Sequence, residues 1–245
     1  MILDKSADTF LGGQVRVEQP PSGFRSGLDA VMLAAAVPAR PAQTALELGA
    51  GAGTASLCLA SRIPYLAITG VEIDPDLAQL ANRNAAVNGT ARLVTFVAAD
   101  IFALPPGLKR EFDHVLVNPP FHAEGQVSPD AARARALSDQ GQLTDWLNLG
   151  LQRTVSGGYF TVILRADRLP EALAALPVAG VTMLPLWPRS GEPAKRVLLQ
   201  ARKGSGAAFA FLPGLVLHDS SGAYTPEANA ILRGGAALAL TRGAL

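Results

Sequence analysis

Short apolar runs alternate with helix-like patterns from residue 44 onward, and each run is bounded by turn or acidic residues. This alternation is typical of a parallel sheet whose strands are joined by crossover helices. We therefore predict an α/β fold. The predicted strands are residues 44–49, 67–73, 92–98, 112–118 and 159–165, and the predicted helices are residues 53–62, 76–88 and 143–155.

The second of these helices carries clear signals at both ends. Asp74 precedes the helix, where its side chain can accept hydrogen bonds from the first amides, and Pro75 suits a first turn that needs no amide donor. Gly89 follows the helix and can adopt the left-handed conformation that ends one. We therefore expect a helix that begins and ends close to these residues.

Further elements are predicted on both sides of this region. Residues 181–187 and 196–201 are two more strands, and no helix of about ten residues separates them. We therefore expect them to form an antiparallel hairpin. The remaining predicted elements are helices at residues 29–37 and 226–233, a strand at residues 212–218, and a long polar connection at residues 125–142 of the kind in which functional loops gather.

Composition excludes several classes of protein. The chain has 245 residues, of which 49% are hydrophobic and 17% charged, so it is too apolar to be disordered. Residues 172–188 form the longest uncharged stretch, which is too short for a membrane span and is broken by prolines. The first ten residues contain Asp4 and Asp8, unlike a secretory signal, and Cys58 has no cysteine to pair with. We therefore expect a cytoplasmic protein without a membrane helix.

The net charge of +1 hides an asymmetry along the chain. Residues 151–245 contain 10 Lys and Arg but only 5 Asp and Glu, whereas the preceding 150 residues are acidic. Lys195, Arg196, Arg202 and Lys203 form a cluster that could offer cations to a phosphate backbone. An ordinary solvated face explains the same residues equally well.

A glycine-rich turn joins the first strand to its helix. Gly49, Gly51 and Gly53 allow the backbone to turn tightly and to approach a ligand closely. The dinucleotide-binding pattern would place a further glycine where this chain has Thr54. Glu47, at the end of the strand, suits an ammonium group better than a pyrophosphate, because two anions repel. These features argue against NAD.

Two more acids end the next two strands. Glu72 lies at the distance from the glycines at which a carboxylate can accept hydrogen bonds from ribose hydroxyls. Asp100 could accept a hydrogen bond from the exocyclic amine of an adenine while Ile101 packs on its ring. Each acid alone is more commonly a helix cap or a solvated side chain. Together beside a glycine turn they indicate a ligand with an ammonium, a ribose and an adenine but no phosphate, which is S-adenosylmethionine.

The fourth strand runs into Asn118-Pro119-Pro120-Phe121. The two prolines stiffen the loop, so that the side-chain oxygen of Asn118 and the carbonyl of Pro119 can face one NH2 group. Two acceptors that hold its hydrogens can aim the nitrogen lone pair at an incoming methyl group, while Phe121 stacks on a planar ring. The structural alternative is a turn that leaves the strand and folds its aromatic residue into the core.

This combination resembles the class I S-adenosylmethionine-dependent methyltransferases that act on exocyclic or amide nitrogens. The segments at residues 19–30 and 189–199, together with the phenylalanine form of the motif, are similar to the tRNA1(Val) adenine-N6 methyltransferase family, and the resemblance spans residues 10–235. It implies a Rossmann-like, mostly parallel sheet of seven strands whose last strand is antiparallel. It also implies a single domain over residues 1–245, with an N-terminal extension on the cofactor side (1–43), a core (44–203) and a C-terminal extension (204–245).

The resemblance assigns roles to individual residues. Ser26 or Asp29 would add cofactor contacts from the N-terminal segment, although both also suit a helix cap. The predicted cofactor residues are Ser26, Asp29, Glu47, Gly49, Gly51, Gly53, Glu72, Ile73, Asp100, Ile101 and Asn118; the predicted target-amine site is Asn118, Pro119, Pro120 and Phe121; and the predicted substrate contacts are Phe121, Arg189, Lys195 and Arg196.

Several substrates share the same core motif. The resemblance favours N6 of adenine in tRNA, but glutamine-N5 methylation of proteins and guanine-N2 methylation of ribosomal RNA stay open, as does a noncatalytic cofactor-binding scaffold. The acidic first 150 residues and the lack of a dedicated RNA-binding domain speak against tight RNA binding by this chain alone. No metal is expected, because His114, His122 and His218 lack metal-ligand spacing. The oligomeric state is left open.

Overall fold

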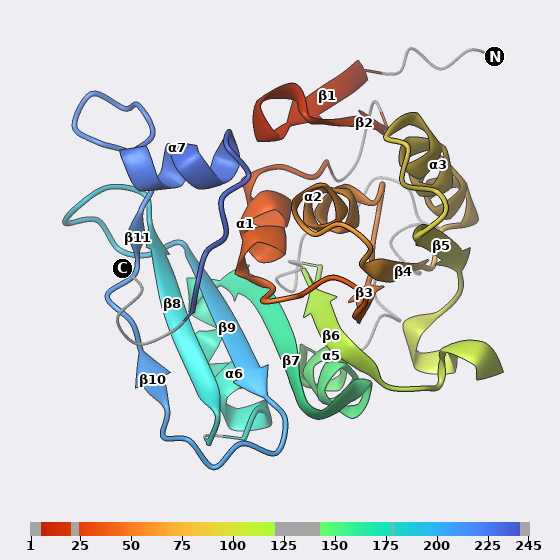
Figure 1. The fold of residues 1–245 in the computed structure, drawn as a ribbon. Coiled ribbons are helices and arrows are strands. Elements are labelled where there is room, and N and C mark those ends of the chain that lie inside the picture. Colours follow the sequence, from red (N-terminus) through yellow and green to blue (C-terminus); the bar gives the residue numbers. More distant parts are fainter. Residues whose placement is uncertain (1–5, 21–24, 121–142, 178, 241–245) are drawn as a thin grey trace, which may run out of the picture.

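The computed structural model describes residues 6–20, 25–120, 143–177 and 179–240 of the chain. Its centre is a nine-stranded sheet with helices on both faces (Figure 1). Phe121, His122 and the polar connection at residues 125–142 lie outside the described residues. Within the described residues, no helix is long and apolar enough to cross a membrane.

The order of the strands across the sheet is β10-β8-β9-β7-β6-β3-β4-β5. The short strand β11 pairs with the last two residues of β8. Only β9 runs antiparallel to its neighbours. The strands are β3 (Thr44–Leu48), β4 (Ala67–Glu72), β5 (Val94–Ala98), β6 (Phe112–Val117), β7 (Thr154–Arg165), β8 (Val181–Trp187), β9 (Arg196–Arg202), β10 (Ala210–Phe211) and β11 (Leu215–Val216).

The predicted fold class is confirmed, and so is the antiparallel hairpin of β8 and β9. The count of seven strands falls short, because the tail adds two strands of two residues each to β8 where one strand was predicted at residues 212–218. The division into a core and two extensions stays a prediction.

Strand β7 and helix α6 (Leu169–Ala175) differ from the predicted elements, because a glycine can lie inside a strand and a proline can lie in the first turn of a helix. Strand β7 begins at Thr154, and its register with β6 shifts between Phe112 and His114, so Gly157 and Gly158 form an irregularity inside a strand rather than its start. Helix α6 was not predicted. It has a proline in its first turn, where proline does not break a helix.

The helices form a layer on each face of the sheet. Apolar side chains of one face of β3–β9 pack with the helices α1, α2, α3 and α7, whereas those of the other face pack with α5 and α6. The helices are α1 (Leu28–Ala36), α2 (Thr54–Arg62), α3 (Pro75–Val87), α5 (Leu143–Gln152), α6 and α7 (Pro226–Leu232).

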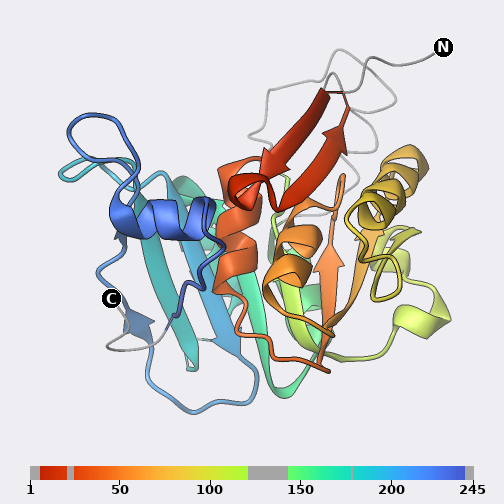
Figure 2. The same cartoon turned by 45° about the horizontal axis from the view of Figure 1, so that its top comes forward.

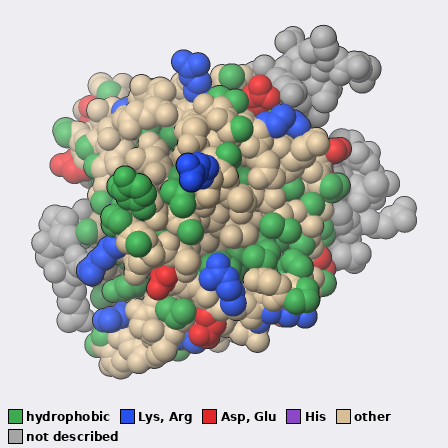
Figure 3. Space-filling view, turned by 45° about the vertical axis from the view of Figure 1, so that its right-hand side comes forward, with side chains coloured by type: hydrophobic (Ala, Val, Ile, Leu, Met, Phe, Trp, Pro, Cys, Tyr) green, Lys and Arg blue, Asp and Glu red, His purple; other side chains and the backbone are tan. Residues whose placement is uncertain are grey.

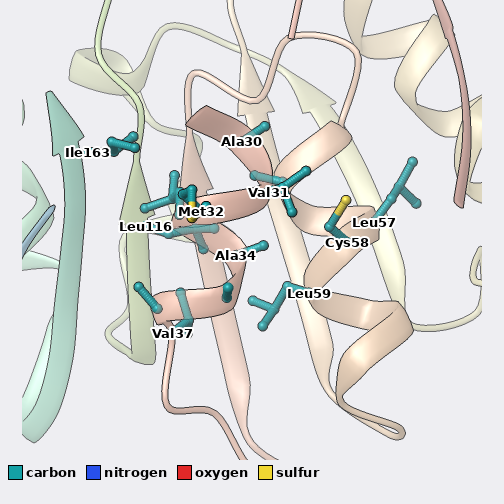
Figure 4. Packing of buried hydrophobic residues seen from close by; sticks show 14 of the residues in the cluster. Ala30, Val31, Met32, Ala34, Val37, Leu57, Cys58, Leu59, Leu116 and Ile163 are labelled. Atoms are coloured by element: carbon teal, nitrogen blue, oxygen red, sulfur yellow. The ribbon is translucent and has the colours of Figure 1, made fainter. Parts of the chain in front are cut away.

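Helix α1 packs closely against α2 and the middle of the sheet. Residues 30–36 of α1 are all apolar and buried, and Met32 is fully buried together with Leu116 of β6 and Ile163 of β7 (Figure 4). Cys58 of α2 is buried in the same cluster. Such dense packing holds the first residues of α1 and α2 firmly relative to the ends of the strands.

The predicted end signals of α3 are confirmed. Asp74 Oδ1 accepts hydrogen bonds from the amides of Asp76 (2.9 Å) and Leu77 (3.3 Å), and Pro75 is the first residue of the helix. Gly89 follows the helix with a φ of +68°. The cap residues therefore set both limits of α3, as the sequence predicts.

The N-terminal segment holds an antiparallel hairpin that the sequence analysis did not predict. Strands β1 (Ser6–Phe10) and β2 (Val15–Gln19) pair over five residues each. The hairpin lies over the helix layer, and β2 contacts α2 and α3 (Figure 2). A signal for the hairpin is present in the sequence: valine alternates with charged residues at residues 15–18, soon after two glycines. In the structure, Val15, Val17 and Gln19 are buried and the residues between them are not.

Candidate active site

The candidate site lies at the carboxyl edge of the parallel strands. The chain enters the sheet at β3, continues outward to β4 and β5, and then returns to β6 on the other side of β3. This reversal puts the switch point of the strand order at the ends of β3 and β6, which is where open α/β sheets bind ligands. Because Leu48 pairs with Val117, the residues that follow them, Gly49 and Asn118, leave neighbouring strands side by side.

The three glycines of the turn differ in what a side chain at each position would contact. All three have positive φ angles. A Cβ on Gly49 would lie 2.9 Å from the Trp146 ring, and one on Gly53 would lie 2.5 Å from the Phe96 ring, so both are required by packing within the protein. A Cβ on Gly51 would meet nothing within 4 Å. Gly51 is therefore the glycine of this turn whose missing side chain leaves room for a ligand.

Glu72 holds this turn from the side of β4. Its two carboxylate oxygens accept hydrogen bonds from the amides of Gly51 (2.8 Å) and Asp74 (3.0 Å). Burial raises the pKa of its carboxyl group, and these hydrogen bonds work in the opposite direction. The structure thus shows how Glu72 shapes the turn, and its contact with a ribose stays a prediction.

Glu47 lies inside the helix layer beneath the turn. It accepts hydrogen bonds from the amide of Ser56 (3.0 Å) and from the Ser56 hydroxyl, in the first turn of α2. Burial raises the pKa of Glu47 from 4.5 to about 7, although the bonds from Ser56 lower it. Its contact with an ammonium group stays a prediction, and any such contact would favour the ionised carboxylate.

At the end of β5, Asp100 is exposed, and its side chain accepts a hydrogen bond from the amide of Phe102 (2.9 Å). Ile101 is buried against the α5 face of the sheet. The more accessible apolar side chains here are Ile73, 39% exposed, and Phe102, 41% exposed. Phe102 also meets Trp146 edge-to-face, with ring centroids 6.1 Å apart. Phe102 is not among the predicted site residues, although an aromatic residue two positions after the acid at the end of β5 is a usable signal in the sequence.

Two residues at this edge have a buried side-chain oxygen without a hydrogen-bond partner in the described part of the chain: Asn118, through Oδ1, and Thr54, through Oγ1. Buried polar groups are nearly always paired, so the unpaired acceptor that follows β6 needs an explanation. Pro119 beside it is buried and Pro120 is half-buried. The stacking predicted for Phe121 lies outside the described residues.

The N-terminal segment reaches the same edge through Ser26 and Asp29. The amide of Ser26 donates to Gln19 Oε1 (2.6 Å), and Gln19 Nε2 donates to the carbonyl of Ser26 (3.1 Å). Gly27 is the N-cap residue of α1, and no side chain caps the helix. The alternative role of Ser26 or Asp29 as a cap is therefore wrong. Asp29 instead forms an ion pair with Arg196 of β9, 2.8 Å away.

The predicted cluster of four cations is wrong. Lys195 and Arg196 lie at one end of β9, and Arg202 and Lys203 lie at the other, about 20 Å away at the usual rise of a strand. Lys203 is bound to Glu111 at the opposite edge of the sheet. Near the site, Arg189 pairs with Glu192 (3.2 Å). Lys195 is exposed.

The two histidines in the described residues contact other side chains of the protein, as expected for a structural role. His114 is buried, its Nε2 donates to Gln43 Oε1 (2.9 Å) and its ring stacks on Tyr159. Burial lowers the pKa of His114 to about 4. His218 stacks on Tyr224 with ring centroids 4.9 Å apart. Over the residues that the structure describes, no group of three or more His, Cys, Asp and Glu could hold a metal ion.

These features fit the parts of S-adenosylmethionine. The open space at Gly51 leaves room for the ligand against the turn, and the accessible Ile73 and Phe102 offer apolar surface to a flat adenine ring. Acidic side chains follow or end three adjacent strands, and no phosphate-binding lysine is present in the turn. The unpaired Asn118 Oδ1 can accept a hydrogen bond from a ligand, and its predicted contact with the target amine stays a prediction.

Comparisons with known proteins identify the family of this chain. The methyltransferase small domain family matches residues 26–145. The tRNA1(Val) (adenine(37)-N6)-methyltransferase of Yersinia enterocolitica is 32% identical over 91% of this chain and 90% of its own length, and the protein of the same name from Porphyromonas gingivalis is 30% identical over 90% of this chain and 91% of its own.

Solved structures give the same result for the fold. A crystal structure described as a predicted O-methyltransferase from Agrobacterium tumefaciens is similar, with a TM-score of 0.72 and 30% identity, over 86% of this chain and 98% of that one. The chain is therefore an S-adenosylmethionine-dependent methyltransferase, and it belongs to the family whose curated members are named tRNA1(Val) (adenine(37)-N6)-methyltransferase.

Proposed function

We propose that this methyltransferase transfers a methyl group from S-adenosylmethionine to the exocyclic N6 of an adenine in tRNA. The observation that carries the proposal is the buried, unpaired Oδ1 of Asn118 beside the glycine turn. A buried acceptor without a partner costs about 1 to 3 kcal/mol, and the NH2 group of a bound substrate would supply the missing donor.

Asn118 acts by orientation. Its Oδ1 accepts a hydrogen bond from the target amine, which favours the geometry in which the nitrogen lone pair faces the methyl group. S-adenosylmethionine supplies a methyl group on a sulfonium that is already an activated leaving group. Pro119 and Pro120 limit the movement of the loop, so that the acceptor keeps its direction. No strong base is needed, because the amine can lose its proton after the transfer.

The cofactor residues have a separate task. Glu72 holds the amide of Gly51, so the turn keeps its shape before the ligand arrives. Ile73 and Phe102 offer apolar surface for the adenine, and we assign the ammonium group to Glu47 and the ribose hydroxyls to Glu72. These assignments are supported by the position of all four residues at the ends of β3, β4 and β5.

The amide at position 118 supports nitrogen rather than oxygen as the methyl acceptor. A hydroxyl substrate needs a base that removes its proton, whereas a neutral amide oxygen is a very weak base. Among nitrogen substrates, the names of the two relatives favour adenine N6 in tRNA over a protein glutamine or a guanine. An adenine within folded RNA would have to leave its stack to reach Asn118 at the carboxyl edge of the sheet.

The described surface indicates modest RNA affinity. Arg189 and Arg196 are each paired with an acid, which leaves less positive charge for phosphates than the sequence suggests. On the face seen in Figure 3, Lys and Arg side chains are spread out rather than gathered in one patch. We therefore assign Lys195, at the carboxyl edge, as a phosphate contact.

Nucleoside mass spectrometry of tRNA tests the proposal. Cells that lack the protein should lose one N6-methyladenosine from their tRNA, and the wild-type gene should restore it while the Asn118→Ala gene does not. Purified protein incubated with labelled S-adenosylmethionine should label this tRNA but not a protein extract. Label in protein alone, or an unchanged content of N6-methyladenosine, would contradict the proposed substrate.

A further inference from the structure

Helix α3 presents two asparagines, four residues apart, to the hairpin strand β2. Asn88 Oδ1 accepts a hydrogen bond from the amide of Arg16 (2.9 Å), and Asn88 Nδ2 donates to the carbonyl of the same residue (2.6 Å). Asn84 makes the same pair of bonds with Glu18, at 2.9 Å and 3.0 Å. The two side chains therefore bind β2 to α3 in the same way, and Figure 2 shows the hairpin beside this helix.

One contact distinguishes Asn84 from Asn88. Asn84 Nδ2 also donates to the carbonyl of Ala52 (3.0 Å), which stands between Gly51 and Gly53 in the glycine turn. The corresponding extra bond of Asn88 goes to the carbonyl of Asn84, inside its own helix. Asn84 is 1% exposed, so water cannot readily replace it at the Ala52 carbonyl.

The bond to Ala52 completes the support of the turn. On the side of β4, the amides of Gly49 and Ala50 donate to the carbonyl of Val71, and Glu72 accepts from Gly51. On the side of α3, the Ala52 carbonyl is held by Asn84. Because a glycine-rich backbone has many accessible conformations, a turn held on one side only would adopt several of them.

We propose that Asn84 is a positioning residue for S-adenosylmethionine, which fixes the glycine turn in its binding conformation and joins it to the N-terminal hairpin. The proposal rests on the cofactor site described above but not on the identity of the methyl acceptor. Asn84 acts through the backbone of Ala52, and Asn88 is a matched control that holds the hairpin without holding the turn.

The experiment compares Asn84→Ala with Asn88→Ala in the full chain. Binding of S-adenosylhomocysteine is measured by isothermal titration calorimetry, at a temperature where thermal unfolding shows all proteins folded. We expect Asn84→Ala to raise the Kd about tenfold, as the loss of one buried hydrogen bond to the turn implies. Asn88→Ala should change the Kd less than twofold, while both variants lower the Tm.

Kinetics and hydrogen exchange distinguish a role of Asn84 in positioning the turn from a general loss of fold stability. Asn84→Ala should raise KM for S-adenosylmethionine and leave kcat at saturation close to wild type. Amide exchange at residues 51–54 should become faster in Asn84→Ala than in Asn88→Ala. If Asn84→Ala does not fold, Asn84→Ser takes its place under the same criteria.

Two results would overturn the inference alone: an Asn84 variant with the wild-type Kd, or equal increases of the Kd in the Asn84 and Asn88 variants. The second result would mean that the hairpin, and not the Ala52 carbonyl, accounts for the loss. A wild-type protein that binds no S-adenosylhomocysteine would overturn this inference together with the proposed function.

Discussion

The two halves of the carboxyl edge differ in how far the protein satisfies the polar side chains at the ends of the strands. On the cofactor half, at the ends of β3, β4 and β5, Glu47, Glu72 and Asp100 all accept hydrogen bonds from nearby groups of the chain. On the target half, after β6, Asn118 Oδ1 is buried and lacks a partner within the described residues. The carboxylates of the first half are held before any ligand binds, although Thr54 Oγ1 beside the turn is also buried without a described partner, whereas the second half keeps a strand-end acceptor for its substrate.

This difference gives the two halves separable functions. Changes on the cofactor half should act on ligand affinity or on the stability of the fold, because its groups bind one another. Changes on the target half should act on the rate of methyl transfer with little effect on the folded state. Four measurements test this distinction.

The largest expected effect is on the target half. Asn118→Ala should raise the barrier to methyl transfer by about 2 to 4 kcal/mol, as the loss of an oriented hydrogen-bond partner does elsewhere. The Kd for S-adenosylhomocysteine should stay near the wild-type value. Steady-state kinetics and calorimetry on the same preparation measure both quantities, and unchanged turnover would reject the role given to Asn118.

Two glycines of the turn should respond differently to substitution by alanine, one mainly in fold stability and the other also in cofactor affinity. A methyl group on Gly53 would overlap the Phe96 ring, so Gly53→Ala should lower the free energy of unfolding by about 1 to 3 kcal/mol. A methyl group on Gly51 would enter open space and cost only the strain of a φ of +55°, so Gly51→Ala should destabilise the fold less than Gly53→Ala and should also lower cofactor affinity. Denaturant unfolding and calorimetry compare the pair, and a Gly51 variant that binds the cofactor normally would show that the ligand does not lie against this residue.

Glu47 should make cofactor binding depend on pH. The folded pKa of about 7 exceeds the ordinary 4.5, so Glu47 stabilises the free protein fully below pH 4.5, and this contribution is lost as the pH rises to about 7. If the cofactor's ammonium group contacts Glu47, it favours the carboxylate, and affinity should rise between pH 6 and 8 with release of a proton. Calorimetry in buffers of different ionisation enthalpy measures this release, and Glu47→Gln is the control. A binding enthalpy independent of buffer would leave Glu47 as a support for Ser56 alone.

The smallest effect is expected at the cations beside the target half. Lys195→Ala should weaken tRNA binding a few-fold and reduce the salt slope by about 1, as the loss of one phosphate contact does. Arg196→Ala breaks the ion pair with Asp29, so it should lower the Tm more than Lys195→Ala does. Filter binding at several salt concentrations and thermal unfolding distinguish the two. The reverse pattern would make Arg196 the RNA contact.

The regular part of the fold could be predicted from the sequence, because its strands and helices carry local signals. The strands at β3, β4 and β6 and the caps of α3 follow from apolar runs and from Asp74, Pro75 and Gly89. The early start of β7 was missed because it depends on pairing with the distant β6, whereas the β1–β2 hairpin pairs residues that are close in sequence and was missed despite its local signal. In the sequence, Gly157 and Gly158 indicate the end of an element, whereas the register with β6 places them at an irregularity inside β7.

The candidate site was predictable as a set of positions but not as a set of contacts. Residues at strand ends converge in any parallel sheet, so Glu72, Gly51 and Asn118 could be placed together. Sequence could not show that Asp29 pairs with Arg196, since the two are 167 positions apart. It also could not separate Gly51 from its neighbours, because the difference depends on where Trp146 and Phe96 pack.

Strand β9 is inserted between β7 and β8, although it is the last of the three to be synthesised. During translation, the edge of β7 must stay without its final neighbour until residue 202 has left the ribosome. The ion pair of Asp29 with Arg196 cannot form earlier either. A truncated nascent chain would therefore carry the glycine turn and Asn118 on an unfinished sheet, so the complete site arises only when nearly the whole polypeptide has been made.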